Sequence, residues 1–311
     1  MKSVRFSTFG GPEVLELVDV PDPHPGPGEV RISVRAAGIN ASDWKKRQGL
    51  MDQELPQTLG HEAAGIVDEI GEGVTDVAIG DRVFGFAASG GAQAELTVLF
   101  CYAPIPPSLS FAEAAALPAA AETAARALDQ LGVQSGTTLL VNGASGSVGS
   151  AAVQLATARG ARVIGTGSPG MHDFLQSLGA DPVAYGPGMS DRVRALAPDG
   201  VDLALDVAGS GVLPELIQLA GGPDRVITIA DFAGAQQYGV RFSRGDGGHA
   251  LYVISQLGEL VEAGKFTLPV GQTFPLTEVA EAHRVGESGR VRGKLVLLPG
   301  PLPLQADPAA P

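Results

Sequence analysis

The sequence predicts an α/β protein in which one chain builds a β-rich domain and a second domain with a doubly wound parallel sheet. Three observations predict this. The chain has 311 residues, which fits two domains. Short alternating apolar segments fill its first part, and strands alternate with helical segments in its middle part. Hydrophobic residues make up 44% and charged residues 18%, a balance that excludes a disordered chain.

The first 118 residues are rich in predicted strands. Residues 4–9, 15–20, 29–39, 65–74 and 80–86 have alternating or β-branched patterns and are separated by Gly and Pro clusters. This pattern predicts a small, mostly antiparallel, barrel-like domain. A helix is expected over residues 111–117, because Ser110 and Glu113 have the spacing of a capping box.

Strands and helices alternate after about residue 120, which indicates a parallel sheet with right-handed crossovers. Strands are expected at residues 138–142, 161–167, 182–185, 201–207 and 224–230, with helices between them. Residues 267–276 and 293–299 again resemble strands of the first region. We therefore expect one domain at residues 1–118 plus 265–298, a second at 119–264, and a flexible Pro-rich tail at 299–311.

The composition narrows the choice of partners and compartment. Lys and Arg number 21 against 34 Asp and Glu, a net charge of −13 that argues against nucleic acid and anionic membrane surfaces. No apolar run is long enough to span a membrane, and the first residues lack the apolar region of a signal peptide. Cys101 is the only cysteine, which excludes an internal disulfide and a cysteine-cluster metal site. A cytoplasmic protein is expected.

A glycine-rich turn is the strongest chemical signal in the sequence. It joins the strand at residues 138–142 to the helix at 147–159. Glycines at such a turn let the backbone approach a pyrophosphate, and the helix N-terminus offers free N–H groups to the anion. We expect a dinucleotide cofactor to be bound here by Gly143, Ala144, Ser145, Gly146, Ser147, Val148 and Gly149.

The end of the next strand bears on which dinucleotide binds. An NAD site usually has an acidic residue about 20 residues after the glycines, but this chain has no carboxylate there before Asp173. Its absence admits a 2′-phosphate, and NADPH is therefore favoured. The expected donors to that phosphate are Ser168 and His172, since no Arg or Lys lies between Arg162 and Arg192. An exposed residue at a helix start is an equal alternative for His172.

Several short motifs resemble those of the medium-chain dehydrogenase/reductase superfamily, over residues 1–298. They are GINASD at 38–43, GHEAAG at 60–65, GDRV at 80–83, LP at 117–118, TA at 123–124, the glycine turn, and GK at 293–294. Within the superfamily the chain resembles the zinc-independent NADPH:quinone oxidoreductase branch. The resemblance implies a GroES-like catalytic domain, a Rossmann nucleotide-binding domain and a homodimer.

Residues at the positions of zinc ligands indicate that no catalytic metal is bound. A catalytic zinc needs about three protein ligands. Zinc alcohol dehydrogenases carry a cysteine where this chain has Asn40 and another near Ala121–Glu122, and only His61 resembles a retained ligand. Reduction of a quinone or an activated C=C bond needs placement of hydride donor and acceptor more than a Lewis acid.

The resemblance also implies roles for individual residues. Asn40 is expected beside the nicotinamide, where it orients the substrate, and Thr123 matches a threonine near the same ring. Lys45 would stabilise the enolate formed by hydride attack, with a solvated surface lysine as the equal alternative. Further expected cofactor contacts are Tyr185, Val207, Ala208, Phe232 and Lys294.

The sequence therefore predicts an NADPH-dependent, zinc-free reductase of quinones or α,β-unsaturated carbonyl compounds. Two alternatives stay open. One is a stand-alone reductase of enoyl thioesters, which would need basic residues for the carrier's phosphates, and the only tight cluster is at residues 45–47. The other is a non-catalytic NADPH-binding protein, because fold does not determine function.

Overall fold

The computed structural model describes residues 1–245 and 248–300 and divides into two compact units. Unit 1 consists of Met1–Ala119 and the segment that begins at Pro269, and unit 2 is Ala120–Leu268. The boundaries expected from the sequence lie at 118/119 and 264/265. Most of the expected tail, residues 301–311, lies outside the described residues. Within the described part of the chain, no helix has the length and apolar character needed to span a membrane.

A six-stranded sheet forms the main body of unit 1. Its strand order is β14-β15-β3-β5-β6-β7, and an additional pairing of β3 with β7 closes the sheet on itself. All neighbours are antiparallel except β14 and β15. This arrangement confirms the predicted GroES-like β-rich domain. The strands are β3 (Val30–Ile39), β5 (Glu62–Ile70), β6 (Arg82–Ala87), β7 (Leu96–Pro104), β14 (Val270–Pro275) and β15 (Lys294–Leu298).

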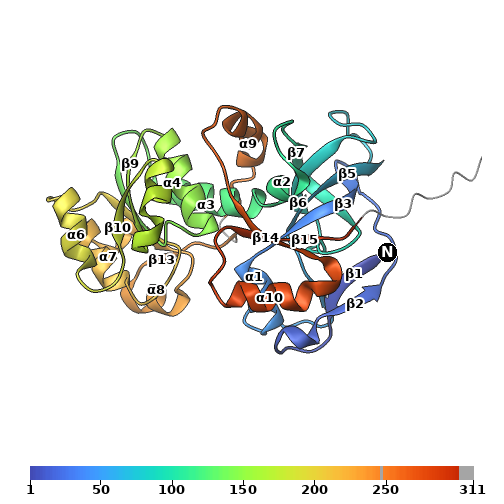
Figure 1. Ribbon diagram of the computed structural model, residues 1–311, viewed down its shortest axis with the longest axis horizontal. Helices are drawn as coiled ribbons and strands as arrows, with labels where there is room; N and C mark the ends of the chain where they lie inside the picture. Colours follow the sequence, from blue (N-terminus) through green and yellow to red (C-terminus); the bar gives the residue numbers. More distant parts are fainter. Residues whose placement is uncertain (246–247, 301–311) are drawn as a thin grey trace, which may run out of the picture. The chain divides into compact units, whose positions relative to one another are not determined.

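A smaller antiparallel sheet and short helices complete unit 1. The sheet has the order β2 (Glu16–Asp19), β1 (Lys2–Phe6), β4 (Gln57–Thr58). The helices are α1 (Ala41–Arg47), α2 (Phe111–Ala115) and α10 (Val279–Glu287), with 3₁₀ turns η1 (Pro12–Val14) and η5 (Leu276–Glu278). Helix α1 packs against α10, as Figure 1 also shows. Helix α2 begins at the predicted capping box, in which the N–H of Ser110 donates to Glu113 over 2.8 Å.

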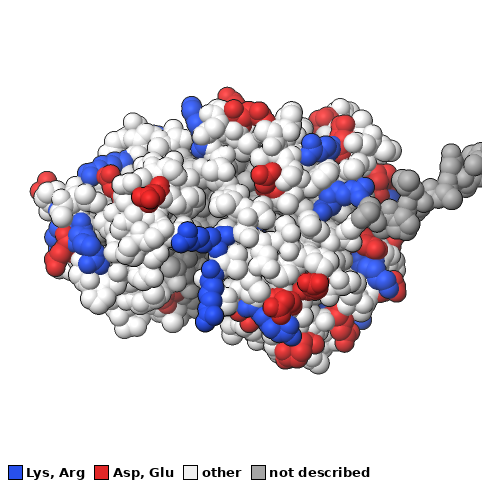
Figure 2. Space-filling view, viewed as in Figure 1, with Lys and Arg blue, Asp and Glu red and all other residues white. Residues whose placement is uncertain are grey.

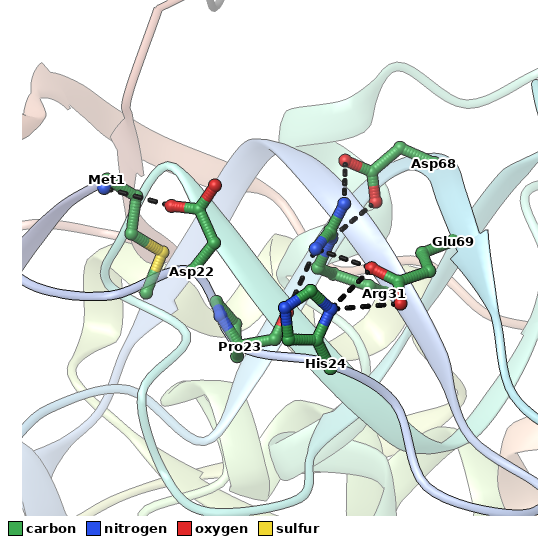
Figure 3. A network of polar contacts seen from close by, with 7 residues as sticks. All are labelled: Met1, Asp22, Pro23, His24, Arg31, Asp68 and Glu69. Carbon is green, nitrogen blue, oxygen red and sulfur yellow. Dashed lines mark hydrogen bonds and ion pairs between the residues drawn. The ribbon is translucent and has the colours of Figure 1, made fainter.

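A polar network fixes the connection between β2 and β3 on the barrel (Figure 3). Arg31 of β3 lies 3.0 Å from Asp68 and 2.5 Å from Glu69, both in β5, and it donates to the carbonyl of Pro23. His24 Nδ1 lies 3.0 Å from Glu69. Because these charges are partly exposed, the network positions the connection and contributes little net stability.

Unit 2 is built on a fully parallel six-stranded sheet of order β10-β9-β8-β11-β12-β13. This is the strand order of the doubly wound dinucleotide fold, and it confirms the predicted Rossmann domain. The order reverses direction at β8, so the crevice for a ligand is expected at the carboxyl ends of β8 and its neighbours. The strands are β8 (Thr138–Asn142), β9 (Arg162–Gly167), β10 (Ala180–Ala184), β11 (Leu203–Asp206), β12 (Val226–Thr228) and β13 (Arg241–Phe242).

Helices pack against this sheet, and Figure 1 shows several of them around it. The helices of unit 2 are α3 (Pro118–Leu131), α4 (Ser147–Ala158), α5 (His172–Ser177), α6 (Met189–Leu196), α7 (Leu213–Ala220), α8 (Phe232–Tyr238) and α9 (Val253–Glu262), with 3₁₀ turns η2 (Pro169–Met171) and η3 (Pro223–Arg225). Helix α4 is buried over residues 149–156, which explains its long run of small and apolar residues. The helix ends where Gly160 adopts a φ of +83°, the left-handed conformation expected after a helix C-terminus.

The chain carries a net charge of −13. On the face drawn in Figure 2, acidic and basic side chains are interspersed, with wide uncharged areas between them. This face therefore presents no single acidic field.

Candidate functional site

The glycine-rich turn of unit 2 has the shape of an anion cradle. Gly143 has a φ of +84°, and a Cβ atom placed there would lie 2.7 Å from the Cβ of Ala208. A Cβ on Gly149 would lie 2.2 Å from the carbonyl oxygen of Gly143. At Gly146, which caps α4, the nearest atom to such a Cβ would be 3.6 Å away. Two glycines thus make the turn compact, whereas a Cβ atom at the third, Gly146, would make only ordinary van der Waals contact.

Gly146 is the N-cap of α4 and directly precedes the free N–H groups of the helix. The first bond along the helix runs from the Ser150 N–H to the Gly146 carbonyl, so the N–H groups of residues 147–149 precede it. Together with the partial positive charge of the helix N-terminus, they suit a pyrophosphate. The turn therefore fits a dinucleotide cofactor.

A buried polar network holds the strand ends beneath this turn. Asp206, fully buried, accepts from Asn142 Nδ2 over 2.9 Å and from Thr228 Oγ1 over 2.7 Å. Thr166 Oγ1 donates to Asn142 Oδ1 and accepts from the N–H of Gly143, each over 2.9 Å. The network joins the ends of β9, β8, β11 and β12, so the glycine turn is fixed from below.

This network was missed in the sequence. Its signal was present, because Asn142, Asp206 and Thr228 are each the last residue of a strand. The N–H groups of Ala208 and Gly209 also donate to Asp206 Oδ1, over 3.2 and 2.9 Å. The loop that carries Val207 and Ala208 is thereby held at the same sheet edge as the turn, next to Gly143.

Arg192 belongs to α6, but its side chain reaches the end of β10. Its Nε and Nη2 atoms lie 3.0 and 2.8 Å from the carbonyl oxygen of Ala184, and Nη1 lies 3.0 Å from that of Pro187. The N–H of Tyr185 reaches the carbonyl of Gly167, the last residue of β9, over 3.4 Å. The guanidinium is therefore close to the strand end where an adenosine ribose is expected. Arg192 was not predicted, because it follows the glycines by many more residues than the usual acidic position of an NAD site.

The other residues predicted around this strand end are placed as follows. Ser168 is half-buried and precedes η2, and His172 begins α5 with its Nε2 atom buried and without a hydrogen-bond partner among the described residues. The side chain of Tyr185 is 62% exposed. Their contact with a cofactor stays a prediction.

Thr123 sits beside a second buried cluster of unit 2. Its Oγ1 atom lies 3.5 Å from Glu122 Oε2, at the limit of a hydrogen bond. Glu122 is buried and pairs with Arg126 over 2.9 Å, with His249 Nδ1 over 3.2 Å and with the N–H of Ala250 over 3.1 Å. The cluster ties α3 to the segment before α9.

Phe232, predicted to cover the nicotinamide, begins α8 and is 45% exposed. It packs edge-on against Phe242, with ring centroids 5.3 Å apart, and Arg244 lies over the ring. Its neighbours hold the ring in place, and almost half of the side chain stays accessible.

Asn40 in unit 1 is held by a buried ion pair. Lys294 Nζ donates to Asn40 Oδ1 over 2.6 Å and lies 2.6 Å from Glu62 Oε1. Asn40 Nδ2 donates to the same Glu62 oxygen over 2.8 Å, and the N–H of Ala119 donates to Glu62 Oε2 over 2.7 Å. Residues predicted separately, Asn40 and Lys294, are thus in direct contact.

Helix α1 starts at Asn40 and presents Lys45 to solvent. Asp43 closes the first turn, since its Oδ2 accepts from the Asn40 N–H over 2.8 Å and its Oδ1 accepts from the Gly60 N–H over 3.2 Å. Burial raises the pKa of Asp43, while the nearby charge of His61 acts in the opposite direction. Lys45 is exposed, which suits either a substrate contact or the solvated lysine weighed above.

The other end of α1 is anchored by a buried cation. Arg47 is fully buried and bonds to the carbonyl of Gly10 and to Glu287, and its Nε lies 3.4 Å from His283 Nδ1. Burial, together with the charge of Arg47, lowers the pKa of His283 to about 3. Trp44 packs edge-on against His283, with ring centroids 6.4 Å apart. The helix that carries Asn40 and Lys45 is therefore fixed at both ends.

Within residues 1–245 and 248–300, no group of three or more His, Cys, Asp or Glu side chains is arranged to hold a metal ion. His61 has Glu62 next to it in sequence, but that carboxylate is committed to Lys294, Asn40 and Ala119.

Two family models match the chain. The model of the alcohol dehydrogenase GroES-like domain matches residues 26–121, and that of the zinc-binding dehydrogenase matches residues 178–297. Among curated proteins, the quinone oxidoreductase of Rattus norvegicus is 33% identical, over 96% of this chain and 98% of its own length. The 2-methylene-furan-3-one reductase of Solanum lycopersicum is 34% identical, over 97% of this chain and 80% of its own.

Solved structures of oxidoreductases are also similar to this chain. The quinone oxidoreductase from Coxiella burnetii has a TM-score of 0.82 at 33% identity and covers 96% of this chain and 99% of its own. A protein described as an NAD-dependent alcohol dehydrogenase has a TM-score of 0.82 at 34% identity, covering 96% and 100%. A mycobacterial protein complexed with NADPH has a TM-score of 0.79 at 29% identity, again covering 96% and 100%.

Proposed function

Because the chain belongs to the zinc-independent, quinone-oxidoreductase-like branch of the medium-chain dehydrogenase/reductase superfamily, we propose that it is an NADPH-dependent reductase of quinones or α,β-unsaturated carbonyl compounds. The observation that carries the proposal is the glycine turn, which leads into the free N–H groups of α4 and is fixed from below by the Asp206 network. A nicotinamide cofactor supplies a hydride equivalent when it is bound.

The choice of NADPH over NADH rests on residues at the end of β9. Relatives do not decide it, since one solved relative holds NADPH and another is described as NAD-dependent. This chain has no carboxylate from Gly167 to His172 to repel a 2′-phosphate. Arg192 brings a positive charge to the neighbouring strand end, and Ser168 adds a hydroxyl. Together they favour a phosphorylated adenosine ribose.

Substrate class follows from the donors that unit 1 offers. Asn40 has an amide and Lys45 an exposed ammonium, and both can donate to a carbonyl oxygen. Negative charge develops on that oxygen when hydride reaches the conjugated carbon, and a donor aimed at it lowers the barrier. One proton, from water or from Lys45, then completes the reduction. The names of two relatives, a quinone oxidoreductase and a 2-methylene-furan-3-one reductase, agree with such acceptors.

Cofactor oxidation against a panel of acceptors tests this proposal. NADPH and NADH would be compared with quinones, enones, enals and an enoyl thioester, and zinc would be measured on the same sample. We expect NADPH to be consumed with a quinone or an enone while zinc stays far below one atom per chain. Preference for NADH, stoichiometric zinc or exclusive use of the thioester would contradict it. Tight NADPH binding without turnover of any acceptor would favour the non-catalytic alternative.

A further inference from the structure

The orientation of the Asn40 amide is determined by its two partners. A lysine ammonium has donors only, so the Asn40 atom 2.6 Å from Lys294 Nζ must be the carbonyl oxygen. An ionised carboxylate accepts only, so the Asn40 atom 2.8 Å from Glu62 Oε1 must be the nitrogen. Turning the amide over would place donor against donor and acceptor against acceptor.

Burial makes this arrangement stiff. The side chains of Lys294 and Glu62 are 4% and 0% exposed, and Glu62 is held in addition by the Ala119 N–H. In such surroundings an ion pair and its hydrogen bonds are little weakened by water. Asn40 itself is only half-buried, so its amide can still meet a ligand.

One donor of the amide remains for that ligand. The Asn40 oxygen accepts from Lys294, and one hydrogen of Nδ2 goes to Glu62. The second Nδ2 hydrogen has no partner within residues 1–245 and 248–300. Because the first two bonds fix the amide plane, they also fix the direction of this remaining N–H.

We propose that the Glu62–Lys294 ion pair is a positioning device that locks the Asn40 amide with one N–H free to bind the carbonyl oxygen of the substrate. The inference rests on the proposed function, because it assigns Asn40 to a carbonyl acceptor. Lys294 and Glu62 act through Asn40 and need not touch the substrate. A donor fixed in advance stabilises developing oxyanion charge without reorganising during the reaction.

A kinetic cycle separates positioning from general stability. The variant Glu62→Gln/Lys294→Gln removes both charges at nearly constant volume, Asn40→Ala removes the amide, and the triple variant combines them. We expect each of the first two to lower kcat about ten-fold or more. The triple variant should be no slower than Asn40→Ala, because a lock has no effect once the amide is gone.

Arg31→Gln/Asp68→Asn is the matched control. It breaks another ion pair of unit 1, between β3 and β5, and neither residue bonds to Asn40 or to α1. Whatever its own effect on kcat, combining it with Asn40→Ala should lower kcat by the product of the two separate factors. If the Glu62/Lys294 change also multiplies with Asn40→Ala, or leaves kcat unchanged, the positioning role is wrong.

The fixed orientation of the Asn40 amide can also be measured without turnover, by hydrogen exchange. In ¹⁵N-labelled protein, with the signals assigned through Asn40→Ala, one side-chain amide proton of Asn40 should exchange slowly with water and the other quickly. In the Glu62→Gln/Lys294→Gln variant the difference should disappear. Equal, fast exchange in the wild type would overturn the lock. Slow exchange of one proton in a protein that turns over no acceptor would overturn the proposed function and leave the lock supported.

Discussion

Lys294 Nζ lies 2.6 Å from Glu62 Oε1, and almost nothing of either side chain reaches solvent. The two residues come from β15 and β5, which are not neighbours in the sheet of unit 1. Burying such a pair costs solvation that its mutual attraction only partly returns. The pair is therefore better explained by what it fixes, the Asn40 amide, than by a contribution to stability.

Removing one partner of this pair should be far more damaging than removing both. Lys294→Met leaves Glu62 as a buried, unpaired carboxylate, and we expect it to lower the free energy of unfolding by about 3–5 kcal/mol. Glu62→Gln/Lys294→Gln should lower it by about 1 kcal/mol or less. Urea unfolding followed by far-UV circular dichroism checks both. Equal losses for the two variants would show that charge burial does not control the site.

The two kinds of glycine in the nucleotide turn should respond differently to alanine. Gly143→Ala forces a side chain into a φ of +84° and against Ala208, so we expect a stability loss of about 2–3 kcal/mol. Gly146→Ala has room and should cost less than about 1 kcal/mol. It should still weaken NADPH binding about ten-fold or more, because its methyl group would stand where we propose that the pyrophosphate binds. Unchanged NADPH fluorescence titration of Gly146→Ala would place the cofactor elsewhere.

Arg192 should set the preference for NADPH over NADH. Arg192→Gln removes a charge whose bond to the proposed 2′-phosphate is worth about 1.5–3 kcal/mol. The Kd for NADH divided by the Kd for NADPH should therefore fall about ten- to a hundred-fold. Arg192→Lys should retain part of the preference, and Arg194→Gln, on the same helix, should retain all of it. Titration calorimetry with both cofactors measures the ratios. An equal loss of affinity for NADPH and NADH in Arg192→Gln would show that the residue only supports the loop at residues 184–188.

The carboxylate of Asp206 should be essential for the stability of unit 2. Asp206→Ala leaves the buried donors of Asn142 and Thr228 without an acceptor, and we expect a loss of about 3–5 kcal/mol. Asp202→Ala is the control, since Asp202 is exposed just before the start of β11 and accepts from the Thr138 N–H. It should cost less than about 1 kcal/mol. Thermal unfolding with and without NADPH compares them, and similar melting temperatures would refute the role of the network.

His283 should make the protein sensitive to acid well above pH 4. Its pKa is lowered from 6.5 to about 3 in the folded state, so below pH 6.5 the unfolded chain binds a proton that the folded protein does not. Stability is then lost as pH falls from about 6.5 towards 3, by about 1.4 kcal/mol per pH unit. In His283→Gln this part of the pH dependence should vanish. Trp44, the only tryptophan and a neighbour of His283, reports unfolding by fluorescence. If the free energy of unfolding changed with pH equally in the wild type and in His283→Gln, the assignment to His283 would be contradicted.

Much of the fold follows from local sequence. The helix after Ser110 was predicted from one capping box, although it ends at Ala115 rather than at residue 117. The strand and helix that flank the glycine turn were predicted because their apolar periods differ. Helix α1 was not predicted, since its seven residues are mostly polar and it is held by Asp43 and Arg47, whose partners are distant in sequence.

The candidate site was predictable only where it is local. The glycine turn is one continuous motif, whereas the Lys294–Asn40 contact joins residues 254 positions apart and has no local signal. Arg192 was not predicted, because it is far from the glycines in sequence although its side chain is near the neighbouring strand end. Its helix in fact returns the guanidinium to the end of β10.

Isotope transfer tests the central claim most directly. NADPH deuterated at the transferable C4 position would be oxidised with an enone, and the product examined by NMR spectroscopy. A reductase of activated C=C bonds places deuterium on the β-carbon of a saturated ketone, and this is the result we predict. Deuterium on a carbinol carbon, with the double bond intact, would identify a carbonyl-reducing alcohol dehydrogenase and contradict the account.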